Sequence, residues 1–130
     1  MPTIGAVRQV ALSAGRSLDA TLAFWSDVLG VPLHARYDPP GIAFLLAGDV
    51  RLFFSDGVPP GTVYLDMAEL DDFYANAKAA GVPFTAQPAL VHLDRDGQFG
   101  PPGEAEWMAF LKDPGGNTVG LVERKPAESS

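Results

Sequence analysis

The stretch 110-FLKDPGGNTVGLVE-123 decides the fold, because it reads as two strands joined by a tight turn. Pro114 fixes φ at the first turn position, the two glycines after it can take positive φ, and Asp113 and Asn117 can cap backbone groups. A Gly-Gly pair can also cradle a phosphate, but no helix follows here to supply free N–H groups. The turn is therefore predicted to serve structure and not chemistry.

Gly120 raises a second question, since it stands in the middle of the second strand. Glycine inside a strand costs stability and leaves a gap on one face of the sheet. Whatever occupies that gap bears on function.

Outward from this stretch, the first half of the chain reads as a strand, a helix and three strands. Ser17 can cap the helix and Gly30 can end it, and between them runs an apolar stripe of Leu18, Leu22, Trp25 and Leu29. Apolar alternation bounded by turn residues predicts the strands at 7–12, 33–37, 41–48 and 50–54.

The second half repeats this order. A strand at 62–67 precedes a helix with a stripe of Leu70, Phe73, Ala77 and Ala80, and strands are expected near 82–86, 107–112 and 118–122. "LGVPL" at 29–33 recurs as "AGVPF" at 80–84, an offset of 51, and "AFL" at 43–45 recurs at 109–111, an offset of 66. The difference, 66 minus 51, indicates a 15-residue insertion within 88–106. Short identities also arise by chance, but two in the same order favour a duplication.

Composition limits the class of protein. A chain of 130 residues is long enough for one domain, so residues 1–130 are expected to form a single domain. The net charge of −7, without a run of Lys or Arg, argues against nucleic acid and membrane as partners. The absence of cysteine removes thiolate nucleophiles and Cys-ligated zinc. No signal-like start or long apolar run is present, so a cytoplasmic location is expected.

Together these features resemble the vicinal oxygen chelate superfamily, which includes glyoxalase I, the bleomycin-resistance proteins and the extradiol dioxygenases. The most specific parts are the pair Phe24-Trp25 before Leu29-Gly30 and the turn at 113–117, and the resemblance covers about residues 5 to 123. It implies an α+β fold of two βαβββ modules that form a curved mixed-sheet cleft, and a homodimer. Module one would span about 5–56, module two about 61–123, and a flexible tail 124–130.

Enzymes of this superfamily generally hold a divalent metal with His, Glu or Gln from four strand positions. Matching the motifs puts Gln9, Phe53, Thr62 and Gly120 at those positions, and only Gln9 could ligate well. A catalytic ion typically needs at least three protein donors. Neither a metal at these positions nor another cofactor is therefore expected.

Strand alternation assigns Leu52 and Phe54, like Val119 and Leu121, to a helix-packing face, and the positions between them to the cleft. The resemblance adds three apolar side chains to the cleft, although plain core packing stays open for each aromatic one. The candidate ligand-binding set is Gln9, Phe44, Phe53, Thr62, Tyr64, His92, Met108, Phe110, Thr118 and Gly120. Such a pocket suits burial of an organic molecule better than proton abstraction.

The insertion brings a histidine and several acids close to the strand that starts near Trp107. His92 lies between apolar neighbours in a strand-like run, whereas His34 follows the helix end and is expected to be a surface or capping residue. Long loops usually carry exposed charges, and this role is expected for Asp94, Asp96 and Glu104.

Two functions follow from these observations. The first is a metal-independent protein that binds a small organic molecule, an aromatic compound or an antibiotic, similar to the antibiotic-sequestering resistance proteins. The negative net charge would favour a cationic ligand. The alternative is a metal-dependent lyase, epimerase or dioxygenase with a displaced metal site of Gln9, His92 and Glu106. No catalytic residue is assigned.

Overall fold

The computed structural model describes residues 2–127, which divide into two compact units. Unit 1 contains the residues up to Thr62 together with Asp113–Asn117, and unit 2 contains Val63–Lys112 and the residues from Thr118 onward. The turn from the second half of the sequence thus belongs to the unit built by the first half.

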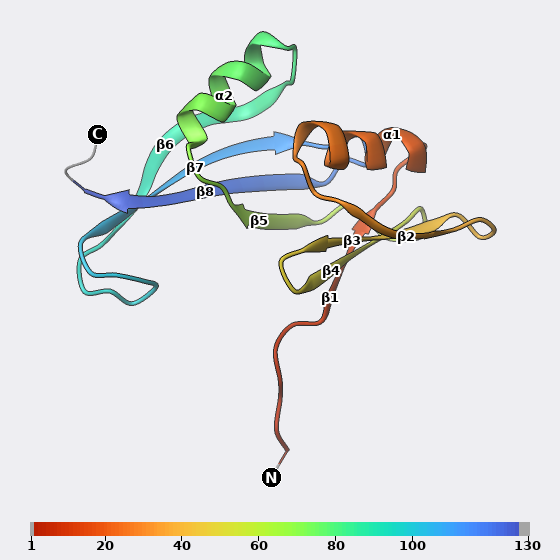
Figure 1. Ribbon diagram of the computed structural model, residues 1–130, viewed down its shortest axis with the longest axis horizontal. Helices are drawn as coiled ribbons and strands as arrows, with labels where there is room; N and C mark the ends of the chain where they lie inside the picture. The colour runs from red at the N-terminus through yellow and green to blue at the C-terminus, as the bar shows by residue number, and fades with distance from the viewer. Residues whose placement is uncertain (1, 128–130) are drawn as a thin grey trace. The chain divides into compact units, whose positions relative to one another are not determined.

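Unit 1 is a four-stranded sheet, sheet A, with its helix on one side (Figure 1). Its elements are β1 (Gln9–Ser13), α1 (Leu18–Ala23), the π-helical turn η1 (Phe24–Val28), β2 (Leu33–Tyr37), β3 (Ile42–Ala47) and β4 (Val50–Ser55). The strand order is β1-β4-β3-β2, with β1 parallel to β4 and the other pairs antiparallel. This is one βαβββ module with a mixed sheet.

Unit 2 repeats the arrangement in sheet B. Its elements are β5 (Thr62–Asp66), α2 (Leu70–Ala79), β6 (Phe84–Asp94), β7 (Glu104–Lys112) and β8 (Thr118–Pro126), with the strand order β5-β8-β7-β6. Each strand of sheet A therefore has its counterpart at the same place in sheet B. The predicted fold of two βαβββ modules is confirmed.

The insertion differs from the expected loop. β6 runs to Asp94 and β7 begins at Glu104, so most of the added residues lengthen one hairpin. β8 likewise continues to Pro126, so residues 124–126 lie in a strand and not in the predicted tail. Ala127 follows the strand, and residues 128–130 of that tail lie outside the described residues.

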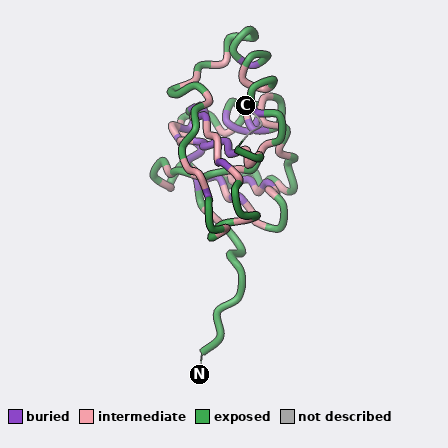
Figure 2. The backbone as a smooth tube through the Cα atoms, turned by 90° about the vertical axis from the view of Figure 1, so that its left-hand side faces the viewer, coloured by how far each residue is buried: buried purple, intermediate pink, exposed green. Residues whose placement is uncertain are grey.

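Each sheet contributes buried residues to a core, and these are purple in Figure 2. In unit 1 the ring of Trp25, which is fully buried, meets the ring of Phe54 edge-on at 5.4 Å between centroids. The buried apolar strand side chains are Leu12, Ala43, Leu45, Leu52 and Phe54 in sheet A, and Ala105, Ala109, Leu111, Val119, Leu121 and Val122 in sheet B. Apart from Val122 they alternate with a period of two, which agrees with the helix-packing face predicted for Leu52 and Phe54 and for Val119 and Leu121.

The turn at 113–117 is held by buried hydrogen bonds within unit 1. Asn117 Oδ1 accepts from the backbone N–H groups of Ser13 and Gly61 at 3.0 Å, and its Nδ2 donates to the Ser13 carbonyl and to Asp113. Trp25 Nε1 donates to Asp113 Oδ2 at 2.8 Å. Gly115 lies against the Ser13 carbonyl, where a Cβ would have no room. The turn joins β1 and η1, which is the structural role that the sequence predicted.

No helix within residues 2–127 is long and apolar enough to cross a membrane.

Candidate functional site

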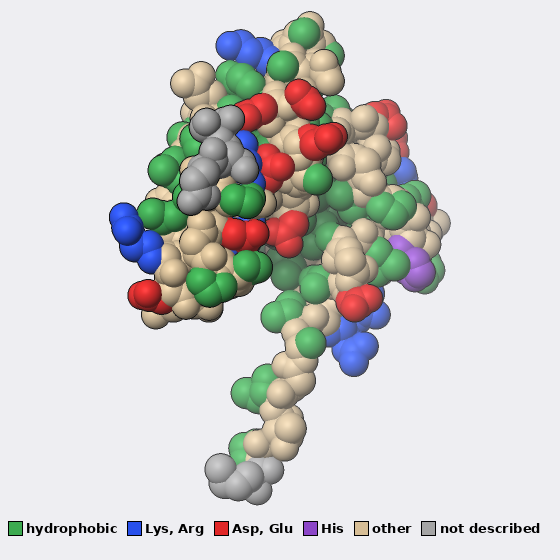
Figure 3. All heavy atoms as spheres, turned by 60° about the vertical axis from the view of Figure 1, so that its left-hand side comes forward, with side chains coloured by type: hydrophobic (Ala, Val, Ile, Leu, Met, Phe, Trp, Pro, Cys, Tyr) green, Lys and Arg blue, Asp and Glu red, His purple; other side chains and the backbone are tan. Residues whose placement is uncertain are grey.

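Sheet A carries an open pocket of about 600 Å³. Its lining residues are His34, Ala35, Tyr37, Pro39, Pro40, Ile42, Phe44 and Arg51. All of them belong to unit 1, and most are apolar or aromatic. Asp and Glu side chains gather on the molecular face drawn in Figure 3, but none lines this pocket.

Strand register brings the pocket residues together. Phe44 of β3 lies opposite Ala35 of β2, and Ile42 lies opposite Tyr37. Their neighbours Ala43 and Leu45 are buried in the core. Because side chains alternate along a strand, Ile42 and Phe44 project from the other face, which carries no helix.

Aromatic contacts continue across this open face. The rings of Phe44 and Phe53 lie 5.2 Å apart with a tilt of 32°, and the rings of Tyr37 and Phe44 meet edge-on at 6.2 Å. Phe44 and Phe53 both belong to the ligand-binding set predicted from the sequence, and the structure brings them into contact. Gln9 lies opposite Arg51 in the β1–β4 register and is exposed.

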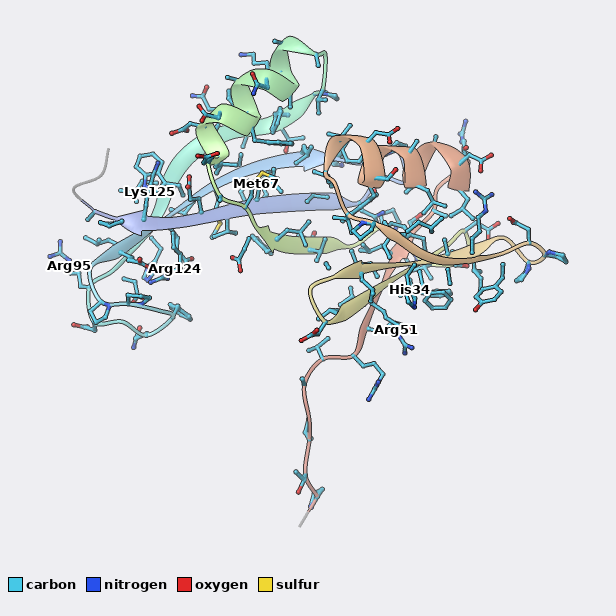
Figure 4. The ribbon with its side chains drawn as sticks, in the orientation of Figure 1. His34, Arg51, Met67, Arg95, Arg124 and Lys125 are labelled. Carbon is cyan, nitrogen blue, oxygen red and sulfur yellow. The ribbon has the colours of Figure 1, made fainter. Side chains whose placement is uncertain are left out.

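Arg51 is the charged group of this pocket. Figure 4 shows it on the side of sheet A away from α1. Its Nε is buried without a hydrogen-bond partner, and no ion pair joins its guanidinium to a carboxylate among residues 2–127. By contrast, Arg36 on the helix side of the same sheet donates to Asp19 and Asp38, and these hydrogen bonds raise its pKa.

The open face of sheet B is closed over Gly120. A Cβ on this residue would lie 2.6 Å from Cδ2 of Tyr64 and 3.0 Å from Cε2 of Phe110. These two rings meet edge-on with centroids 5.8 Å apart. Side chains of unit 2 therefore fill the gap at Gly120, a residue that the sequence analysis assigns to the ligand-binding set.

Three further residues of the predicted set lie around this face. Thr62 is exposed at the start of β5, Met108 pairs with Val122, and Thr118 pairs with Lys112. Gln9, Phe44 and Phe53 belong to unit 1, which also includes Thr62 as its boundary residue.

Arg124 of β8, which is labelled in Figure 4, forms salt bridges with three acids of the β6–β7 hairpin. Its guanidinium donates to Asp94, Glu104 and Glu106 at 2.9, 2.9 and 2.6 Å, and these hydrogen bonds raise the pKa of Arg124. The expectation of exposed loop charges is thus wrong for Asp94, which is 2% exposed, and for Glu104, which is paired. It is confirmed for Asp96, which is exposed.

Asp94 also anchors the loop between β6 and β7. Its carboxylate accepts the backbone N–H groups of Gln98 at 2.8 Å and Phe99 at 3.0 Å. Burial works to raise the pKa of Asp94, but the hydrogen bonds from Phe99, Arg124 and Gln98 outweigh it and lower that pKa to about 2.

His92 lies opposite Glu106 in the β6–β7 register, and its ring meets Phe99 edge-on. Its Nε2 is buried without a hydrogen-bond partner. The Glu106 carboxylate, however, is already bound to Arg124. Among the residues that the structure describes, no group of three or more His, Cys, Asp or Glu side chains could hold a metal ion.

The donors at the four metal positions implied by the resemblance do not fit a metal. Phe53 stacks against Phe44, and Gly120 has no side chain and lies beneath two aromatic rings. Gln9 and Thr62 offer neutral oxygens, which are too few and too weak to hold a catalytic divalent ion. No reaction step is therefore derived through a metal at these positions.

Sequence reasoning missed the polar part of the sheet A pocket. His34 was expected at an unspecified surface, and Arg51 was not singled out. One signal was present, because Arg51 shares its strand parity with Phe53 in 50-VRLFFS-55 and so had to face the same side.

The sequence of this chain matches a known protein family. The Glyoxalase/Bleomycin resistance protein/Dioxygenase superfamily profile matches residues 9–121. No curated protein matches the chain.

Solved structures share the fold at low identity. A lactoylglutathione lyase from Agrobacterium tumefaciens superposes with a TM-score of 0.72 at 22% identity, over 93% of this chain and 95% of that one. A superfamily member from Sphaerobacter thermophilus gives 0.68 at 21% identity, over 92% and 98%. A virulence protein from Salmonella typhimurium gives 0.72 at 15% identity, over 94% and 98%. At these identities the likeness concerns the fold alone.

Proposed function

The chain belongs to the Glyoxalase/Bleomycin resistance protein/Dioxygenase superfamily, and from this premise we propose that it binds a small organic molecule in the sheet A pocket. The observation that carries the proposal is the open pocket of about 600 Å³ on the sheet face without a helix. This volume falls within the usual range of small-molecule sites.

The chemistry of the walls supports binding of a planar, aromatic molecule. Phe44 stands at the centre, in contact with the rings of Tyr37 and Phe53. Aromatic rings offer large apolar areas and prefer stacked or edge-on partners, so a flat ligand would gain both burial and favourable ring geometry. An antibiotic with aromatic rings is one compound of this kind.

We propose that this binding needs no metal. The argument rests on the donor set, since Phe53 and Gly120 offer no ligand atom and Glu106 is bound to Arg124. A lyase, epimerase or dioxygenase with a displaced site would have to take Glu106 out of that salt bridge. No observation favours this alternative.

The test is binding of neutral 2-naphthamide, followed by amide chemical shifts in NMR spectra. We expect shifts at the pocket residues and an affinity that falls roughly five- to tenfold in Phe44→Ala, because the mutation removes a ring from the wall. Phe99→Ala is the matched control, since Phe99 is 69% exposed and lies in unit 2. Absence of binding by both 2-naphthamide and its acid counterpart 2-naphthoate, or equal affinity in Phe44→Ala, would overturn the proposal.

We also propose that the protein forms a homodimer. β6 is the last strand in the order of sheet B, and its side chains Leu90 and Val91 are 54% and 55% exposed. A long edge strand with exposed apolar side chains favours pairing with another chain. A cytoplasmic location remains a prediction from the sequence.

A further inference from the structure

We propose that the ligand of the sheet A pocket is an aromatic acid, whose carboxylate or sulfonate binds the Arg51 guanidinium. This inference rests on the proposed function and names the class of ligand. It starts from the unpaired state of Arg51 within a mostly apolar pocket.

Arg124, the other part-buried arginine among residues 2–127, is paired, and so is the exposed Arg36. Arg124 donates to three carboxylates and Arg36 to two. Arg51 has no carboxylate partner among the described residues, although its Nε is buried. A buried donor without an acceptor is unfavourable, and a guanidinium matches the two oxygens of a carboxylate in geometry and charge. A bound acid would supply what the protein does not.

The local charge of the pocket also favours an anion. Its lining contains Arg51 and His34 and no Asp or Glu. The net charge of −7 would favour a cation at long range, but charges farther away than about 8–10 Å are largely screened at physiological salt. At contact distance Arg51 decides the sign, which reverses the expectation of a cationic ligand.

The apolar walls specify the rest of the molecule. Arg51 lies two residues before Phe53 in β4, so the two side chains project from the same face of sheet A. Because Phe53 stacks on Phe44, the charged group and the aromatic surface lie on that face. Tyr37, Ile42 and the prolines at 39 and 40 complete the walls. A small inorganic anion would satisfy the guanidinium and leave these walls uncovered.

The experiment compares 2-naphthoate with 2-naphthamide, which has nearly the same shape and no charge. We expect the wild type to bind the naphthoate more tightly, and Arg51→Met to weaken naphthoate roughly tenfold while changing naphthamide less than about twofold. Arg51→Lys should recover part of the naphthoate affinity, because it restores charge without the planar fork. Arg95→Met, at an exposed arginine of unit 2, is the control and should change neither affinity.

The outcomes separate this inference from the proposed function. Two results would show that the ligand is not an acid while small-molecule binding stands. In the first, naphthamide binds at the pocket and naphthoate binds no more tightly. In the second, Arg51→Met leaves the affinity for naphthoate unchanged. If neither compound binds, the proposed function itself fails. Inorganic phosphate should displace naphthoate poorly. Displacement at equal concentration would overturn the inference that the ligand is aromatic. Should Arg51→Met fail to fold, the ratio of the naphthoate affinity to the naphthamide affinity is compared between Arg51→Lys and the wild type, which gives the same test.

Discussion

The ring of Tyr64 lies over Gly120, with its Cδ2 only 2.6 Å from where a Cβ of that residue would stand. Phe110 closes the same space from the neighbouring strand. The glycine is therefore explained by packing within unit 2, since its missing side chain makes room for two rings. Tyr64 is 56% exposed, so its ring has space to move outward.

Gly120→Ala should destabilise the protein by about 1–3 kcal/mol, the usual cost of overpacking, as measured by urea unfolding. The backbone of Gly120 does not have positive φ, so steric contact with the rings is the only penalty expected.

A double-mutant cycle isolates that contact. Tyr64→Ala removes the nearer ring, so Gly120→Ala in this background should cost markedly less than in the wild type. Equal costs in both backgrounds would show that Tyr64 does not cover Gly120.

Asn117→Ala should destabilise the protein by about 3 kcal/mol or more, because it leaves backbone groups of Ser13 and Gly61 without this partner and removes one of the donors to the buried Asp113 carboxylate. Asn117→Asp should be at least as harmful, since it places a second carboxylate oxygen against the Ser13 carbonyl and Asp113. Asn76→Ala, at an exposed position of α2, is the control and should stay within about 0.5 kcal/mol. An Asp variant as stable as wild type would contradict the assigned hydrogen bonds.

The fold was predictable because its determinants are local. Pro114, the glycines after it and the flanking Asp113 and Asn117 define a turn from neighbouring residues alone. The repeated order of strands and helix then gave both modules. The partners of Asp113 and Asn117 could not be predicted, because Trp25 lies 88 positions away and Ser13 lies 104 positions away.

The site was only partly predictable for a related reason. Strand alternation put Phe53 on the open face and the family resemblance added Phe44, but neither says which neighbouring rings fill a gap, as Tyr64 does at Gly120. Glycine and charge content suggested a loop for the insertion, whereas much of it forms a hairpin held by the part-buried Arg124 cluster. That cluster joins residues of three strands, so no local sequence pattern predicts it.

Sedimentation tests the proposed homodimer. At micromolar concentration we expect a species of twice 13.7 kDa, and Val91→Lys should shift it toward the single chain, because charge on an exposed edge strand opposes pairing. Arg95→Lys serves as the control, since it keeps the charge just beyond the strand. A wild type that sediments only at 13.7 kDa would refute the dimer, and a dimer unaffected by Val91→Lys would place its interface elsewhere.

Asp94 should make the protein sensitive to acid between about pH 4 and about pH 2. Its pKa falls from 3.8 to about 2 on folding, so above pH 3.8 the ionised carboxylate contributes stability that is lost as the pH falls through 2. The physical cause is that protonation weakens the hydrogen bonds from Arg124 and from the Gln98 and Phe99 N–H groups. Asp94→Asn should lower stability at pH 7 and make its decline between pH 4 and pH 2 shallower, as measured by urea unfolding across that range. Asp96→Asn, two residues away and exposed, should retain the wild-type slope. An unchanged slope in Asp94→Asn would mean that other carboxylates govern acid unfolding and that the Asp94–Arg124 pair does not control it.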